Sequence, residues 1–161
     1  MVELREFHAG DAEAVNGLAV RAFAQYQDRY TDWPVFRSRL EGMSALAGQA
    51  ELIVAELHGV LAGAVGYIGP HKPKAAIFRP EWPIMRMLVV DPAARGHGIG
   101  RLLAQECIAR ARRDGANEIA LHTSQIMNVA LPMYLRMGFQ WRSDVPDIHG
   151  VPYALYTLAL R

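Results

Sequence analysis

Residues 88–103 read LVVDPAARGHGIGRLL: an apolar run, a Pro turn, a loop with three glycines and a leucine-rich segment. The apolar run predicts a buried strand, and the leucine-rich segment predicts a helix that begins near the last glycine. Gly96, Gly98 and Gly100 remove Cβ atoms where the first backbone N–H groups of a helix have no partner inside it. These N–H groups and the positive end of the helix dipole favour an anion. We therefore predict that the loop binds a phosphorylated ligand.

Two arginines and the glycine spacing narrow the choice of ligand. Arg95 and Arg101 flank the loop and add positive charge for a phosphate ester. A sharp strand-to-helix corner is the structural alternative, but it requires fewer glycines. A Walker loop would continue with Lys and Ser or Thr, and a dinucleotide fingerprint starting at Gly96 would need Gly or Ala at position 101. Arg101 therefore disfavours both nucleotide motifs.

The segments on either side of this loop alternate between strand and helix patterns. The expected strands cover residues 2–7, 51–57, 60–68, 84–90, 117–124, 139–143 and 153–160, and the expected helices cover 12–26, 33–48, 100–115 and 128–138. Asp11 is the expected N-cap of the first helix. Segment 69–83, with four prolines, and the turn-rich segment 144–150 are expected loops. The order predicts one α/β domain over residues 1–161.

Composition excludes several classes of protein. The chain has 161 residues, a net charge of +1 and one cysteine, Cys107. The near-zero charge argues against nucleic acid as a partner. A lone cysteine excludes an internal disulfide and a cysteine-based zinc site, and the scattered histidines give no metal-ligand spacing, so we expect no metal. No signal peptide or membrane span is recognisable, and we expect a cytoplasmic protein that does not interact with membranes.

Two motifs resemble those of the GNAT N-acetyltransferase superfamily. Arg95–Gly100 reads RGHGIG and is similar to its acetyl-CoA signature R/Q-x-x-G-x-G/A. Tyr134, Gly138 and Phe139 match its Tyr-x-x-x-Gly-Phe motif. The resemblance covers nearly the whole chain, more loosely before Leu52. It implies a mixed, mostly antiparallel sheet of about seven strands, flanked by about four helices, with splayed central strands.

The resemblance also implies where acetyl-CoA would bind. The strand at 85–90 would offer its backbone near Leu88 and Val90 to the pantetheine arm, and the strand at 118–123 would splay away from it. Loop amides would wrap the pyrophosphate, and these belong to Arg95, Gly96, His97, Gly98, Ile99, Gly100 and Arg101. The His97 side chain is expected to point to solvent.

Tyr134 matches the tyrosine that, in the family, protonates the departing thiolate. A phenol is a neutral donor at pH 7, which suits this role. A core aromatic with a structural hydrogen-bond partner is the alternative. Many relatives have an asparagine seven residues earlier, where this chain has Met127. Asn128 lies one position later, and we assign it no role beyond a candidate helix cap.

A general base is less evident. The strand before the loop contains no carboxylate, where relatives often have a glutamate. His122, Glu81 and a chain of water molecules are the candidates. Arg86 is expected to contact an anionic group of the substrate or an internal carboxylate. Phe23 and Tyr26 are candidates for lining the acceptor pocket.

The predicted activity is acetyl transfer from acetyl-CoA to a primary amine of a small molecule or peptide, by direct attack in a ternary complex. The missing strand glutamate leaves a second hypothesis open, a non-catalytic module that binds acyl-CoA. By analogy with the family, a homodimer is an expected assembly.

Overall fold

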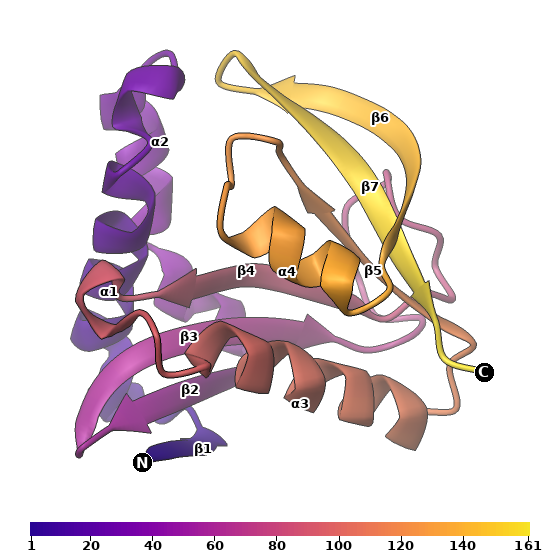
Figure 1. The fold of residues 1–161 in the computed structure, drawn as a ribbon, viewed down its shortest axis with the longest axis horizontal. Coiled ribbons are helices and arrows are strands. Elements are labelled where there is room, and N and C mark those ends of the chain that lie inside the picture. The colour runs from indigo at the N-terminus through magenta and orange to yellow at the C-terminus, as the bar shows by residue number, and fades with distance from the viewer.

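A computed structural model describes all of residues 1–161 (Figure 1). The seven strands are β1 (Val2–Glu6), β2 (Glu51–Leu57), β3 (Val60–Ile68), β4 (Ile84–Val90), β5 (Glu118–Thr123), β6 (Gln140–Ile148) and β7 (Val151–Ala159). The four α-helices are α1 (Ala12–Ala24), α2 (Trp33–Leu40), α3 (Ile99–Arg113) and α4 (Ala130–Arg136). The order of strands and α-helices follows the sequence-based prediction.

The strands form one sheet in the order β1-β2-β3-β4-β5-β7-β6. Every neighbouring pair is antiparallel except β4 and β5, which are parallel and pair in register only at Ile84 and Ala120. Beyond that point the two strands diverge, and α4 lies beside the opening between them (Figure 1). The predicted splayed pair of central strands is therefore confirmed.

Helices cover both faces of the sheet. On one face, α3 buries Leu103, Cys107 and Ala111, which recur every four residues and pack with residues of α4. This spacing places all three on one side of the helix. Cys107 is a core thiol, and burial raises its pKa. On the other face, α1 and α2 bury a second cluster that includes Leu18 and Phe36. None of the helices combines the length and the apolar character needed to cross a bilayer.

Two sequence-based expectations are wrong. Residues 144–148 belong to β6, and His149 and Gly150 alone form the turn to β7. β6 is an edge strand whose pairing shifts between Val145 and Ile148, and an edge irregularity of this kind tolerates Pro146. The expected helix at 33–48 ends at Leu40, and a separate 3₁₀ segment covers Met43–Gly48.

Asp11 is the N-cap residue of α1, as predicted, but its side chain has another role. Its carboxylate makes no capping hydrogen bond to α1. It accepts hydrogen bonds from Arg5 at 2.8 and 2.9 Å and from the His8 backbone N–H at 3.0 Å. Arg5 also donates to Glu56 at 2.7 Å. Asp11 therefore joins β1, β2 and the chain entering α1, because a charged partner is within reach of its carboxylate.

Candidate active site

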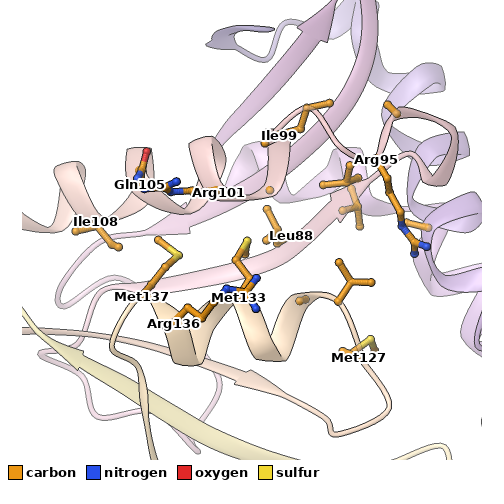
Figure 2. Close-up of a pocket in the computed structure, with 18 of the residues that line it drawn as sticks. Leu88, Arg95, Ile99, Arg101, Gln105, Ile108, Met127, Met133, Arg136 and Met137 are labelled. Carbon is orange, nitrogen blue, oxygen red and sulfur yellow. The ribbon is translucent and has the colours of Figure 1, made fainter.

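A cleft of about 940 Å³ lies between α3 and α4. Its lining includes Leu88 and Val90 of β4, together with side chains of both helices. Figure 2 shows Ile99, Arg101, Gln105 and Ile108 of α3 opposite Met133 and Arg136 of α4. The cleft is therefore built where β4 and β5 separate, with a helix on either side.

The glycine loop forms one end of this cleft. Gly96 and Gly98 have φ angles of 87° and 73°, a left-handed conformation that glycine adopts without the strain of a side chain. A Cβ built at either position would meet no atom within 4 Å, so the space beside the loop is open. Gly98 is the N-cap of α3, and the helix has no acidic residue in its first turn. The free N–H groups of that turn therefore offer a site for an anion.

The charge of the cleft agrees with this geometry. Four arginines and no acidic residue line it: Arg95, Arg101, Arg112 and Arg136. The Arg95 guanidinium donates a hydrogen bond to the side chain of Gln25 at the end of α1, so the loop is held against that helix. The remaining lining is largely apolar and includes Met133 and Met137. A ligand with several negative charges and a long flexible arm fits these properties.

A β-bulge interrupts the register of β4 beside the cleft. Ala64 of β3 faces Val89, whereas Gly66 faces Arg86, so β4 contains one more residue than β3 between these pairs. Met87, in the bulge, has a φ angle of 57°. Leu88 has no register partner on β3 or on β5. A ligand that lies along the strand can therefore approach the Leu88 backbone at a point where neither neighbouring strand is in register with it.

A second cleft, of about 340 Å³, lies on the α1 and α2 side of β4. It shares four lining residues with the first cleft: Phe23, Leu88, Met127 and Ala130. The two clefts therefore meet between the first helix, the β4 bulge and the start of α4. A ligand in one cleft can reach a ligand in the other at this junction.

Tyr134 lies on α4 and lines the second cleft. Its side chain is buried, and its ring packs edge-to-face against Phe139, with 5.7 Å between the ring centroids. The hydroxyl of Tyr67, another buried tyrosine, donates a hydrogen bond to Asp114. The Tyr134 hydroxyl, in contrast, has no hydrogen-bond partner in the protein. Burial raises the pKa of Tyr134, so the phenol stays protonated at neutral pH. A neutral donor without an internal partner is free to serve a ligand.

The candidate bases differ in position. His122 lines the second cleft, where burial and then the charge of Arg86 lower its pKa to about 4. Its imidazole is therefore neutral at physiological pH. Glu81 is exposed and lines neither cleft. Arg86 lines the second cleft beside His122, and no acidic residue lines that cleft. The structure contains no group of three or more side chains suited to a metal ion.

The structure brings most of the sequence-predicted site residues together. Leu88, Val90, Tyr26 and all loop residues from Arg95 to Arg101 except His97 line the larger cleft, Arg86 and Tyr134 line the smaller one, and Phe23 lines both. His97 is exposed, with Nδ1 lying 3.1 Å from the carbonyl oxygen of Ala94. Tyr26 lies beside Arg95. Asn128 does not cap α4, whose N-cap is Val129.

Several lining residues have no signal in the sequence. Arg112 is typical of a helix C-terminus, and Arg136 of an exposed helix position, so neither suggests a ligand. Gln25, at the end of α1, lies far from the loop in the chain but contacts Arg95. Arg39 and Met43 line the smaller cleft from the weakly patterned first third of the chain. Only the tertiary fold identifies these residues.

Comparisons with known proteins agree with this architecture. Residues 14–139 match the sequence profile of the acetyltransferase (GNAT) family. A mycothiol acetyltransferase of Thermobispora bispora is 31% identical over 150 residues, covering 89% of this chain and 48% of that protein. The chain spans about half the length of the curated relatives that match most of it.

Two solved structures share the fold. The PaiA N-acetyltransferase of Thermoplasma acidophilum, in complex with coenzyme A, superposes with a TM-score of 0.78 and 16% identity over 99% of both chains. YncA of Salmonella typhimurium, a putative acetyltransferase solved with acetyl-CoA, superposes with a TM-score of 0.69 and 20% identity, covering 99% of this chain and 94% of that one.

Proposed function

The chain belongs to the acetyltransferase (GNAT) family, and from this premise we propose that it transfers an acetyl group from acetyl-CoA to a primary amine of a small molecule or peptide. The observation that carries the proposal is the meeting of two clefts beside Leu88, with Tyr134 lining the smaller one. The larger cleft would hold acetyl-CoA and the smaller one the amine. Transfer is then direct, in a ternary complex.

The loop and the β4 bulge fit the parts of acetyl-CoA. The free amides at the start of α3 and the arginines of the larger cleft would bind its phosphates. The backbone of Leu88, which has no register partner on β3 or β5, would hydrogen-bond its pantetheine amides, in the manner of an added strand. When bound there, acetyl-CoA supplies an activated acetyl thioester. The relatives' acetyltransferase names and the coenzyme A in the two solved neighbours support this cosubstrate.

The transfer requires that a proton reach the leaving thiolate and that the amine lose one. As the amine nitrogen bonds to the acetyl carbon and the C–S bond breaks, the Tyr134 hydroxyl donates its proton to the leaving thiolate. The amine loses its proton to water, because neither cleft contains a carboxylate and the His122 pKa of about 4 makes it a weak base. Tyr134 regains a proton from solvent after thiol release.

Acetyl-CoA-dependent thiol release tests the proposal. Purified protein is incubated with acetyl-CoA and a panel of amino acids, peptides, polyamines and aminoglycosides, and free thiol is followed over time. We expect amine-dependent release well above hydrolysis, with the acetylated amine detected by mass spectrometry. The second hypothesis, a non-catalytic acyl-CoA-binding module, predicts binding of acetyl-CoA by calorimetry and no amine-dependent release. The missing strand glutamate favours that hypothesis, whereas the unpartnered hydroxyl of Tyr134 favours the enzyme.

A further inference from the structure

Arg86 is a charged side chain without a partner in the smaller cleft. It is half-buried, and desolvation alone lowers its pKa, with no contribution from an acidic side chain. It takes part in none of the ion pairs or side-chain hydrogen bonds of the structure. Arg110 shows the contrast, because it is also half-buried but pairs with Glu6, Glu51 and Glu106. A guanidinium removed from water without an anion is costly, so its position requires another explanation.

His122 lies next to Arg86 across the opening between β4 and β5. The two strands pair at Ile84 and Ala120, and two residues further along each strand are Arg86 and His122. Burial, and then the charge of Arg86, lower the pKa of the imidazole and keep it neutral. The Nδ1 atom of His122 is buried and has no hydrogen-bond partner, the one such side-chain nitrogen or oxygen in the structure. The fold thus places a bare cation and a polar group with unused hydrogen-bonding capacity side by side.

The rest of the smaller cleft has a different character. It contains no aspartate or glutamate, and most of its lining is aromatic or aliphatic, including Phe23, Phe36, Met43 and Tyr153. Arg39 adds a second positive charge from an exposed position on α2. The cleft is therefore suited to an apolar body that carries one negative charge. A polyamine, which offers positive charges alone, would meet repulsion there.

Coenzyme A is not the source of this negative charge. Arg86 does not line the larger cleft, which has four arginines of its own. The anion that pairs with Arg86 must accordingly belong to the molecule in the smaller cleft.

We propose that the amine acceptor is an amino carboxylate with a bulky apolar side chain, whose carboxylate binds Arg86 and accepts a hydrogen bond from His122. This inference rests on the proposed acetyl transfer and adds the substrate class to it. A carboxylate matches the planar fork of a guanidinium and accepts two parallel hydrogen bonds from it. With the carboxylate held at the β4–β5 opening, the apolar side chain fills the aromatic part of the cleft. The amine then points toward the junction near Tyr134.

Matched acceptors test the charge requirement. L-methionine and L-phenylalanine are each compared with their amides and with the amines that lack the carboxyl group, by kcat/KM for thiol release at saturating acetyl-CoA. We expect the carboxylates to be favoured about 10- to 100-fold, as for a charge-assisted pair in a partly buried site. The comparison is stringent, because a larger fraction of the amino groups is neutral in the amides than in the carboxylates at a given pH. The amides would therefore react faster if the negative charge of the carboxylate did not contribute to binding.

Substitutions of Arg86 test the residue. Arg86→Gln should raise KM for the carboxylates and remove their advantage over the amides, whereas Arg86→Lys should restore part of it. Arg37→Gln is the matched control, because it removes the same charge from an exposed site where Arg37 pairs with Glu41, outside both clefts. This control should keep the full preference. Binding of coenzyme A, measured by calorimetry, should be unchanged in all three variants.

The outcomes separate this inference from the proposed function. Equal kcat/KM for the carboxylates and their amides, or an equal loss of both in Arg86→Gln, would overturn the inference and leave acetyl transfer standing. If none of the amines causes thiol release from acetyl-CoA, the proposed acetyl transfer is refuted. The inference about Arg86 is then tested by ligand binding instead. Calorimetry of N-acetyl-L-methionine and its amide on the coenzyme A complex should then show a preference for the carboxylate that Arg86→Gln abolishes. Binding insensitive to this substitution would refute the inference.

Discussion

Tyr134 is a buried phenol with no hydrogen-bond partner in the protein, beside the junction of the two clefts. The hydroxyl oxygen itself is not among the buried polar atoms without a partner, so it is open to the cleft, and the burial of the side chain raises its pKa and keeps it protonated. Both properties are understandable if the partner is a ligand atom that is present during the reaction. The residue is thus expected to matter for turnover more than for the fold.

Replacement of Tyr134 by Phe tests this expectation. We expect kcat to fall about 100-fold or more, because the leaving thiolate loses its proton donor. The affinity for coenzyme A should change little. The free energy of unfolding should change by less than about 1 kcal/mol, since no internal hydrogen bond is lost. An equal loss of turnover and of coenzyme A binding would contradict the role of Tyr134 as an acid.

Gly98→Ala tests the loop by calorimetry with coenzyme A. The φ angle of 73° makes alanine cost about 1 kcal/mol of stability, and its Cβ would occupy the open space where a phosphate approaches the amides. We expect affinity to fall at least about 10-fold, as for one lost charge-assisted contact. Gly115→Ala is the control, because Gly115 has the same φ angle and equally open surroundings at the far end of α3. It should lose similar stability and no affinity.

At the scale of single residues, the sequence identifies those site residues that belong to a short motif. The glycines and the flanking arginines are recognisable because open amides and positive charge at this spacing suit a phosphate, whereas Tyr134 was identified through the resemblance to the GNAT motif. Arg86 could be predicted only as far as an anion, from the substrate or from within. The structure removes the internal candidate, since no carboxylate contributes to its pKa. Arg112 and Arg136 were unpredictable, because their role depends on how α3 and α4 face each other.

Among the elements, β4 shows how one extra residue shapes a site. The bulge at Met87 takes Leu88 out of register with β3, while β5 has already separated on the other side. It also changes the alternation of the strand, because Met85 packs in the cluster under α3 whereas Met87 and Val89 pack in the cluster under α1. Sequence predicts the strand from its apolar run, but a bulge leaves no trace in hydrophobicity. In β6 the turn-forming residues after position 143 predict a loop, whereas the strand continues through them with an irregular register.

The link between β1, β2 and the start of α1 should make stability depend on pH. The hydrogen bonds from Arg5, with a further one from the His8 backbone, lower the pKa of Asp11 from 3.8 to about 2. A carboxylate with a lowered pKa stabilises the fold above its unfolded pKa, and this contribution is lost as the pH falls through the folded pKa. The affected window therefore runs from about pH 4 to pH 2.

Asp11→Asn tests this window by chemical unfolding at several pH values. The variant should be less stable than the wild type at neutral pH, and the difference should shrink as the pH falls toward 2. Asp28→Asn, at an exposed position without an ion pair, serves as the control and should follow the wild-type curve. A constant difference between Asp11→Asn and the wild type at every pH would refute the assignment.

Over the whole molecule, the sheet consists of β1 to β4 and β5 to β7, joined in register at one pair of residues. α3 packs on one part and α4 lies beside the opening, so the larger cleft has walls from both. The element order and the number of strands could be predicted from sequence, because each segment carries its own periodicity. The width of the opening could not, since it depends on residues distant in the chain.

Ligand binding should therefore stabilise the whole chain. At a concentration of 100 times Kd, coenzyme A should add about 2.7 kcal/mol to the free energy of unfolding. For a domain of this size, that corresponds to a rise in Tm of about 5 to 10 °C. Differential scanning fluorimetry over a range of coenzyme A concentrations measures it. Gly98→Ala should need a higher concentration for the same rise, and a Tm insensitive to both coenzyme A and acetyl-CoA would contradict the assignment of the cleft.

The lone register pair between Ile84 and Ala120 has a mechanical consequence. The N-terminal edge strand lies in one part of the sheet and the C-terminal hairpin in the other, so tension applied between the chain ends passes through that joint. A ligand that hydrogen-bonds along β4 would supply, from outside the polypeptide, the strand pairing that β5 does not provide. Binding of such a ligand would then complete the pairing along β4, and its release would undo it.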